Sequence, residues 1–188
     1  MKKTHAAPHR HAVQFYEDTA SLCRMAAGFL ADGLTAGGPS VVIATPPHEA
    51  QILDELNRRG VNVEQARRDG QLVMLDADET LGVCMIDGSP DADLFATYMG
   101  IVLDQLGRIQ PGTTIRAYGE MVDVLWKSGQ TEAAIKLEIM WNALALEYGF
   151  SLLCGYAMGH FYKEPENYRR VCEQHSEVHS LSDRRADA

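Results

Sequence analysis

The stretch His11-Ala-Val-Gln-Phe-Tyr-Glu-Asp-Thr-Ala-Ser-Leu22 decides the fold that the rest of the chain follows. Its first six residues are apolar enough for a buried strand, and Glu17-Asp18-Thr19 is typical of a turn. Apolar side chains then recur at a period of 3.6 residues, which predicts an amphipathic helix from Ala20 to Ala36. Asp18 or Thr19 is expected to cap the start of this helix. The chain therefore begins with a strand, a turn and a helix.

The connection between this strand and helix has the layout of a nucleotide-binding site without the residues that hold a nucleotide. A P-loop would read G-x-x-x-x-G-K-[ST], with glycine amides and a lysine around the phosphates. Residues 15–22 contain neither glycine nor lysine, and Glu17 and Asp18 stand where a phosphate would have to come. We therefore expect no ATPase activity and a site used for a different purpose.

Length and composition indicate one ordinary globular domain. The chain has 188 residues, of which 46% are hydrophobic, so it can bury a sizeable core. Its net charge of −9 argues against nucleic-acid binding as the main role, and the basic grouping Arg58-Arg59 with Arg67-Arg68 is expected to be a solvated surface. We expect a flexible amino terminus over residues 1–10, a single domain over residues 11–178 and a flexible tail over residues 179–188.

Cysteine usage and hydropathy favour a cytoplasmic location. The four cysteines, Cys23, Cys84, Cys154 and Cys172, form no C-x-x-C pair, and no signal peptide precedes them. The longest apolar runs fall far short of the roughly 20 residues that a membrane span needs. We expect reduced thiols and no membrane contact.

Strands and helices alternate along the whole chain. Continuous apolar runs predict further strands at residues 40–45, 71–76, 113–118 and 150–156. Helical periodicity predicts helices at residues 48–59, 91–109, 131–148 and 166–175. This alternation is typical of a three-layer α/β/α fold with a mainly parallel central sheet. Residues 78–90 contain two glycines and a proline and are expected to form a mobile loop that acts as a lid.

In a parallel sheet of this kind, ligands bind beyond the carboxyl ends of the strands. That rule selects for attention Tyr16 and Glu17, Thr45 and His48, Asp76 and Asp78, Gly119 and Glu120, and residues 154–160. From these we take as candidate ligand-binding residues Tyr16, Glu17, Glu120, Cys154, Tyr156 and His160. Glu120 follows Gly119 at a strand end, where a carboxylate accepts hydrogen bonds, holds a cation or acts as a base. A purely structural role for Glu120, as a helix-start carboxylate or in an ion pair with Arg116, is an equally weighted alternative.

Two side chains are also candidates for catalysis. Cys154 lies in an apolar strand, where an inert packed thiol is the expected state, because a reactive thiolate needs a nearby cation or helix N-terminus. Neither Cys154 nor Glu120 has an orienting partner that the sequence reveals. His11 opens the first strand, at the opposite end of the sheet from Glu120, so we expect a structural His11 and no dyad between the two. We expect no catalytic residue, with an enzyme using Glu120 or Cys154 as the less favoured alternative.

Histidines at positions 5, 9, 11, 175 and 179 raise the question of a metal. Their spacing matches no ligand pattern such as H-E-x-x-H or C-x-x-C. We expect no metal and no cofactor.

Five short motifs occur in a characteristic order and spacing. They are His11-x-x-x-Phe15-Tyr16-x-x-x-x-x-Leu22, Arg116-x-x-Gly119-Glu120-Met121-x-x-x-Leu125-Trp126-x-x-Gly129, Leu137-Glu138-x-x-Trp141-Asn142, Leu152-Leu153-Cys154-x-Tyr156 and Cys172-x-x-His175-Ser176. Together they resemble the MEDS family, the methanogen/methylotroph, DcmR sensory domain. The resemblance extends from about His11 to Val178, which is nearly the whole chain.

The resemblance implies a bacterial sensory module related to the RecA/KaiC-like ATPases but lacking the P-loop. It implies signal transduction through a small organic ligand and a protein partner, such as a histidine kinase or a transcription regulator, with no direct contact to nucleic acid. No helix-turn-helix or kinase segment is recognised in the chain, so output is expected through a partner or through a change of homo-oligomeric state. The family motif residues that either contact ligand or hold the fold are His11, Phe15, Arg116, Gly119, Trp126, Glu138 and Trp141.

The resemblance also implies a RecA-like strand order, in which the first strand lies between the fourth and the fifth. Tyr16, Glu120 and the segment from Cys154 to Tyr156 would then meet in one aromatic-lined crevice, which suits a small and largely apolar or weakly polar ligand.

Two competing hypotheses are a pure protein-interaction module with a vestigial pocket and a residual nucleotide binder.

Overall fold

The structure is a computed structural model and describes residues 10–162 and 164–179, without the side chain of His160. The flexible ends expected over residues 1–10 and 179–188 lie outside the described residues, except for Arg10 and His179. His179 is the last residue of a strand.

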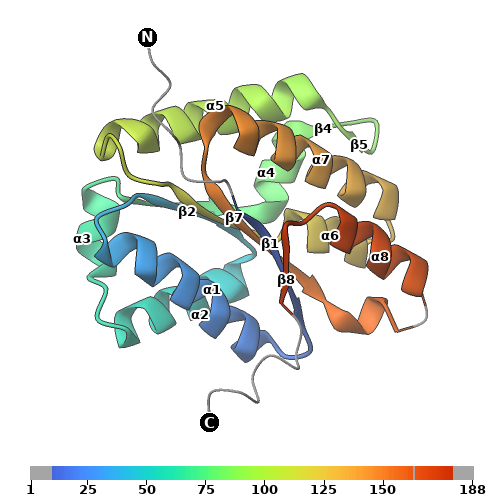
Figure 1. The fold of residues 1–188 in the computed structure, drawn as a ribbon, viewed down its shortest axis with the longest axis horizontal. Coiled ribbons are helices and arrows are strands. Elements are labelled where there is room, and N and C mark those ends of the chain that lie inside the picture. Colours follow the sequence, from blue (N-terminus) through green and yellow to red (C-terminus); the bar gives the residue numbers. More distant parts are fainter. Residues whose placement is uncertain (1–9, 163, 180–188) are drawn as a thin grey trace.

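A parallel sheet of six strands forms the centre of the described part of the chain (Figure 1). In spatial order the strands are β3 (Leu72–Asp76), β2 (Ser40–Ala44), β6 (Arg116–Gly119), β7 (Ser151–Ala157), β1 (His11–Tyr16) and β8 (Glu177–His179). Every residue of β1 and β2 is buried, as their unbroken apolar runs predict for strands covered on both faces. The predicted α/β class and parallel sheet are confirmed.

The position of β1 corrects the expected strand order. β1 pairs along its full length with β7, from His11 opposite Leu152 to Tyr16 opposite Ala157. β6 lies on the other side of β7, next to β2, so the first strand does not lie between the fourth and the fifth. The RecA-like order is therefore wrong for this chain. The outer edge of β1 is paired by β8, a short strand that the sequence did not predict.

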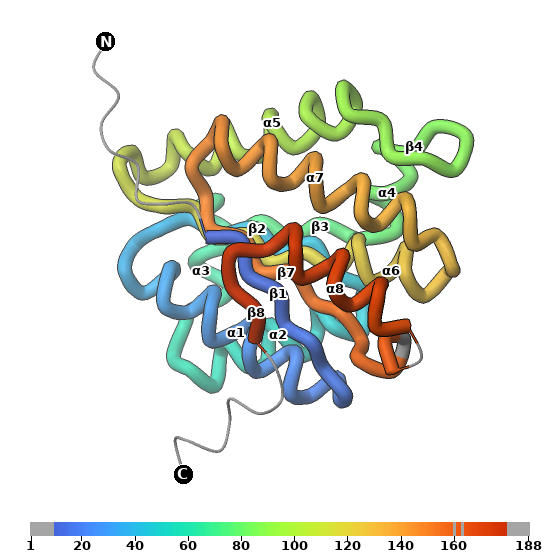
Figure 2. Tube along the Cα trace, turned by 45° about the vertical axis from the view of Figure 1, so that its right-hand side comes forward, coloured from blue at the N-terminus to red at the C-terminus, as the bar shows by residue number. Residues whose placement is uncertain are grey.

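Two helical layers cover the two faces of the sheet (Figures 1 and 2). One layer consists of α1 (Thr19–Thr35), α2 (Pro46–Arg58) and α3 (Val63–Arg68). The other consists of α4 (Ala77–Cys84), α5 (Ala92–Ile109), α6 (Met121–Lys127), α7 (Thr131–Tyr148) and α8 (Pro165–Glu173). The three-layer α/β/α architecture is thereby confirmed. Among the described helices, none is both long and apolar enough to cross a membrane.

The expected loop over residues 78–90 is largely regular structure. Asp76 caps α4 by accepting a hydrogen bond from the amide of Glu79 at 2.9 Å, and Thr80, Leu81 and Cys84 are buried. A small hairpin of β4 (Met85–Ile86) and β5 (Ser89–Pro90) completes the segment. The helix forms because this cap and the buried face stabilise it by more than Gly82 destabilises it. No close contact requires a glycine at position 82, since a Cβ added there would meet nothing within 4 Å.

The pleat of the strands assigns neighbouring side chains to opposite layers. In β1, Val13 and Phe15 join the core beneath α5 and α7, whereas Ala12 and Tyr16 join the core beneath α1 and α2. The same alternation in β7 places Cys154 and Tyr156 under α7 and Leu153 under α1. Residues at one end of the sheet are therefore divided between two separate environments.

Candidate functional site

The strongest candidate site lies where β2 and β6 end side by side. After β2 the chain continues into α2 on one face of the sheet, and after β6 it continues into α6 on the other. Adjacent strands whose connections leave on opposite faces create a topological switch point, where open α/β sheets bind ligands. A pocket of about 380 Å³, called the strand-end pocket below, opens here. Its lining residues are Thr45, His48, Asp78, Glu120, Asp123, Val124, Lys127 and Ser128.

Glu120 forms one wall of the strand-end pocket and is only 2% exposed. One carboxylate oxygen accepts a hydrogen bond from the amide of Thr45, and the other contacts Nδ1 of His48 at 2.6 Å and the hydroxyl of Tyr118 at 3.1 Å. Burial alone would raise the pKa of Glu120, but the bonds to His48 and Thr45 outweigh it and hold the pKa below its usual value. Glu120 is thus a buried carboxylate whose two oxygens are both hydrogen-bonded, and it is paired with His48.

The alternative pairing of Glu120 with Arg116 does not occur. The guanidinium of Arg116 donates to the carbonyl of Phe29, lies 3.5 Å from Asp32 and covers the ring of Phe29 at 5.1 Å. Arg116 is at the opposite end of β6 from Glu120, because Arg116 begins this strand and Glu120 follows its last residue.

Asp123 and Lys127 line the same pocket and form a second polar group with Tyr16, which lies behind them and outside the pocket lining. Asp123 is 2% exposed and accepts hydrogen bonds from the amide of Ala157 at 2.9 Å and from the hydroxyl of Tyr16 at 2.8 Å. The ammonium of Lys127 lies 2.7 Å from Asp123 and 2.9 Å from the Tyr16 hydroxyl. Burial, followed by the charge of Asp123, raises the pKa of Tyr16 well above its usual value. This group connects α6 to the ends of β1 and β7.

Strand-end reasoning identifies Tyr16, His48 and Glu120 but misses Asp123 and Lys127. The sequence predicts His48 in a helix after Pro46-Pro47 without indicating a role, and it marks residues 122–126 only as a short apolar segment. Asp123 and Lys127 carry opposite charge four residues apart, which is the spacing of an ion pair on one face of a helix. That spacing is the signal by which the sequence could have revealed them.

The pocket is polar rather than aromatic. Tyr156, a residue expected to line it, packs instead in one cluster of ring contacts with Phe15, Trp126, Phe161 and Tyr168. Trp141 contacts the rings of Phe95 and Phe150. Several family motif residues are therefore part of the core.

Cys154 and Tyr156 do not meet Tyr16 and Glu120 in one crevice. Tyr156 donates a 2.9 Å hydrogen bond to Glu138 of α7, and the thiol of Cys154 lies 3.6 Å from the same carboxylate. The expected single crevice is wrong because alternate residues of a pleated strand face opposite layers. Burial, then the charge of Glu138, raises the pKa of both Cys154 and Tyr156 well above their usual values.

The remaining predicted residues lie apart from the strand-end pocket. Glu17 accepts a hydrogen bond from the hydroxyl of Tyr162 on the surface. The side chain of His160 lies outside the described residues, as do His5 and His9. His11 contacts Glu138 at 3.2 Å whereas Glu120 pairs with His48, so His11 and Glu120 form no dyad.

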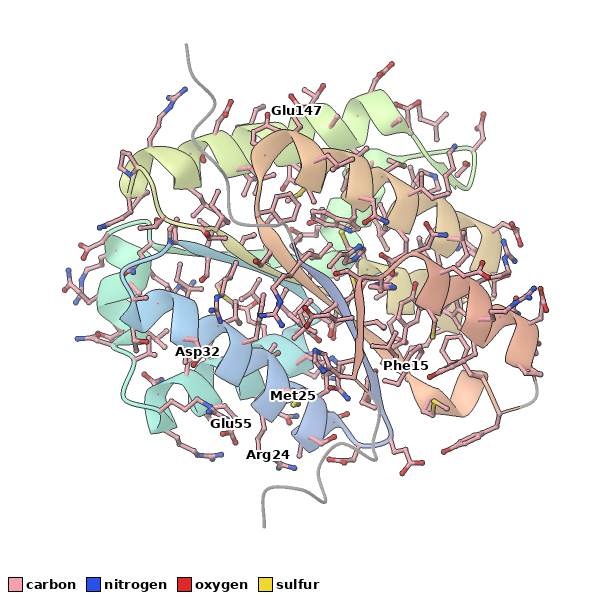
Figure 3. The ribbon with its side chains drawn as sticks, in the orientation of Figure 1. Phe15, Arg24, Met25, Asp32, Glu55 and Glu147 are labelled. Carbon is pink, nitrogen blue, oxygen red and sulfur yellow. The ribbon has the colours of Figure 1, made fainter. Side chains whose placement is uncertain are left out.

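A larger cavity of about 570 Å³, called the α1 cavity below, lies at the amino ends of β6, β7 and β1. Its lining combines apolar side chains such as Met25 and Phe29 with Arg10, Arg24, Arg59 and Arg116. Figure 3 shows Asp32, Met25 and Arg24 following one another along α1. Arg10 is bound by Glu177, and Arg116 contacts Asp32. This cavity is remote from the switch point, and we rank it second for that reason.

A family model described as MEDS, the MEthanogen/methylotroph, DcmR Sensory domain, matches residues 10–176. No curated protein matches the chain.

Proposed function

The chain belongs to the MEDS family of sensory domains, and from this membership we propose that it is a module that senses a small organic molecule. The ligand binds in the strand-end pocket, and binding changes the activity of a signalling partner such as a histidine kinase or a transcription regulator. The observation that carries the proposal is the meeting of Glu120–His48 and Asp123–Lys127 at the switch point of the sheet.

The chemistry of the pocket selects a small polar ligand. Glu120 and Asp123 accept hydrogen bonds, while Lys127, whose side chain is 45% exposed, offers a donor to the open side. A compound with both a donor and an acceptor, such as an amino alcohol or a small amino acid, satisfies both groups. The volume of about 380 Å³ suits a compound of this size.

The start of α1 supports a function other than nucleotide hydrolysis. The carboxylate of Asp18 accepts a 2.7 Å hydrogen bond from the amide of Ser21, so the helix terminus that would attract a phosphate already has an anion. Placing a triphosphate beside Asp18, Glu17 and Glu120 would bring like charges together.

Two properties favour sensing over enzyme chemistry. The raised pKa and complete burial of Cys154 disfavour a nucleophilic thiolate. The lowered pKa of Glu120 makes its carboxylate a weak base near neutral pH. An enzyme that uses either residue remains the less favoured alternative.

A route from the pocket to a partner passes through α6. Asp123 and Lys127 belong to α6, and their contacts hold this helix to Tyr16 of β1 and Ala157 of β7. A ligand that takes over the bonds of Lys127 changes this attachment. Because α6 packs against α7, a change in the attachment of α6 also reaches α7.

The outer helices also support a second candidate, a pure protein-interaction module. α5 and α7 lie side by side (Figures 1 and 2) and expose aliphatic side chains, with Ile101 55%, Ile139 53% and Leu146 74% exposed. Such side chains are suited to contact with a partner whether or not the pocket is occupied.

Thermal-shift screening of the full chain tests the sensing proposal. The panel comprises amino alcohols, small amino acids, short-chain carboxylic acids, methylated and halogenated one-carbon and two-carbon compounds, and ATP with magnesium. We expect at least one organic compound, and not ATP, to raise the melting temperature. This rise should vanish in Glu120→Gln and Lys127→Met.

Matched controls are Glu147→Gln, at the outer end of α7 (Figure 3), and Lys136→Met, both at exposed positions. These variants should respond as the wild type does. If the response is instead lost in Arg24→Gln and kept in Glu120→Gln, the ligand occupies the α1 cavity and the strand-end assignment is wrong. A folded protein that responds to no organic compound favours the interaction module.

A further inference from the structure

Four side chains that no part of the proposed function uses converge beneath α7. His11 begins β1, Cys154 lies in β7, Glu138 lies in α7, and His175 follows α8. One nitrogen, sulfur or oxygen atom from each residue lies within 4.8 Å of the corresponding atom of every other. The side chains of His11, Glu138 and His175 are at most 1% exposed, and Cys154 is completely buried. We call these four residues the buried cluster.

Several separations within the buried cluster are close to those around a bound metal, and all lie within 4.8 Å. Nε2 of His11 lies 3.2 Å from a Glu138 oxygen and 3.4 Å from Sγ of Cys154. Sγ of Cys154 lies 3.6 Å from the same oxygen, and Nε2 of His175 lies 3.4 Å from the other oxygen of Glu138. Zinc bonds of 2.0–2.3 Å at tetrahedral angles place ligand atoms roughly 3.3–3.8 Å apart. A metal ion therefore fits with small movements of the side chains.

Hydrogen bonds outside the cluster orient both imidazoles toward its centre. Nδ1 of His11 lies 2.9 Å from Oδ1 of Asn142, and the amide group of Asn142 donates to the carbonyl of Gln174 at 2.9 Å, which fixes its orientation. Nδ1 of His175 lies 2.7 Å from the carbonyl of Val171. Both oxygens can only accept, so each Nδ1 carries a hydrogen, and in the neutral form of each ring the lone pair of Nε2 faces the cluster. Histidines that bind metals are held in this way.

The inner nitrogens of the two histidines differ in their partners, since Nε2 of His11 lies 3.4 Å from Sγ of Cys154. Nε2 of His175 is buried and finds no hydrogen-bond partner among the described residues. In the neutral rings, the Nε2 lone pairs of His11 and His175 both face oxygens of Glu138, which is a repulsive arrangement. Two protonated imidazoles would instead leave a net positive charge in the interior beside one carboxylate. A divalent cation with neutral imidazoles, the Glu138 carboxylate and the Cys154 thiolate has no net charge, which suits a buried site.

We propose that His11, Glu138, Cys154 and His175 bind a divalent transition metal, and that the metal is zinc. Two imidazoles, one thiolate and one carboxylate are zinc ligands, and four protein ligands complete its tetrahedral shell. With no position left open, the ion is structural. It joins the segment after α8, and thereby β8, to β1, β7 and α7. The hydroxyl of Tyr156, 2.9 Å from Glu138, orients the carboxylate from outside.

Sequence spacing could not reveal this site. The four ligands are separated by 127, 16 and 21 positions, and they come from four elements that only the tertiary fold brings together. The expectation of no metal rested on the absence of a local ligand pattern, which a site of this type does not possess.

Metal analysis and cobalt spectroscopy of the full chain test the proposal. After expression with added zinc, we expect one zinc per chain by mass spectrometry and a lower melting temperature once a chelator removes it. Cobalt(II) added to the metal-free chain should give visible bands of tetrahedral cobalt and a near-ultraviolet charge-transfer band from the thiolate. The charge-transfer band should disappear in Cys154→Ala. It should persist in the matched variant Cys84→Ala, whose thiol is buried away from the cluster.

A variant that keeps all four ligands extends the test. Asn142→Ala removes the hydrogen-bond partner of His11, and we expect a zinc affinity about 10- to 100-fold weaker. A folded wild-type chain that takes up no zinc and gives no thiolate band with cobalt overturns the proposal without requiring any variant. Cobalt bound without a thiolate band reflects an adventitious ion on other histidines, and this result also overturns it.

Discussion

Replacing Asp123 with alanine tests whether the polar group of α6 holds the strand-end pocket together. The change removes the acceptor of the Ala157 amide at 2.9 Å and of the Tyr16 hydroxyl at 2.8 Å. A buried donor left without its partner costs about 1–3 kcal/mol. The ion pair with Lys127 adds about 0–1 kcal/mol, since that lysine is half exposed and screened by solvent. Removing a buried carboxylate offsets part of these losses through its desolvation.

The expected net loss is about 2–4 kcal/mol in the free energy of unfolding. For a chain of this length that corresponds to a melting temperature lower by roughly 5–15 °C. Urea unfolding followed by circular dichroism and tryptophan fluorescence measures it. Asp123→Asn keeps an acceptor for Ala157 and should lose less. Asp104→Ala, at an exposed position of α5, should change stability by no more than about 0.5 kcal/mol.

A double-mutant cycle separates the contact from general destabilisation. Asp123→Ala combined with Tyr16→Phe should show a coupling energy of at least about 0.5 kcal/mol, since the two side chains share one hydrogen bond. If Asp123→Ala is no more destabilising than Asp104→Ala, or if the two changes add without coupling, the described role of Asp123 is refuted.

The described contacts predict three more outcomes. Because the pKa of Glu120 is lowered in the folded state, its ionised form stabilises the protein above the ordinary carboxyl pKa of about 4.3, and this stabilisation is lost as the pH falls through the folded pKa. The urea midpoints of wild type and Glu120→Gln should therefore converge on acidification. A difference between the midpoints that stays constant from pH 7 downward contradicts this. Gly155→Ala places a Cβ 3.0 Å from a methyl carbon of Leu22 and should destabilise the protein by about 1–3 kcal/mol, as measured by thermal unfolding. An unchanged melting temperature would show that α1 can move away from the sheet without cost. In native protein near pH 7.5, iodoacetamide should modify the partly exposed Cys172 before the fully buried Cys154, as read by peptide mass spectrometry, and the reverse order would revive a nucleophilic Cys154.

Local sequence patterns predicted the elements of this fold well. Residues 131–148 coincide with α7, and the apolar runs at 40–45 and 150–156 fall within a residue or two of β2 and β7. These elements were predictable because burial imposes a period of 3.6 residues on helices and an unbroken apolar run on covered strands. Asp18, expected as a cap, accepts the Ser21 amide at the start of α1.

Spatial neighbours were harder to predict, since they depend on contacts between distant segments. Nothing in residues 11–16 specifies that β1 pairs with β7 and β8 rather than with β6. The prediction of a loop over residues 78–90 was wrong because it gave more weight to Gly82, Gly88 and Pro90 than to the sequence pattern that predicts α4. That pattern is Asp76 followed three residues later by Glu79, which is typical of a helix start.

The candidate site also combines residues that local patterns predict with contacts between distant segments that they do not. Strand ends predicted Tyr16 and Glu120, because carboxyl ends of parallel strands are shared by all such sheets. His48 also follows a strand end, but its pairing with Glu120, like the approach of Asp123 and Lys127 to Tyr16, depends on strand order. The pleat then determines that Cys154 belongs to the buried cluster and not to the strand-end pocket.

Titration of the strand-end pocket with a compound identified by the thermal-shift panel tests the central claim most directly. Isothermal calorimetry should show binding of one molecule per chain to wild type and to Glu147→Gln. Affinity should fall about 10-fold or more in Glu120→Gln and in Lys127→Met, which corresponds to the loss of a charged hydrogen bond. Equal affinity in all four proteins would show that the ligand binds elsewhere and would contradict the assignment of the sensing site.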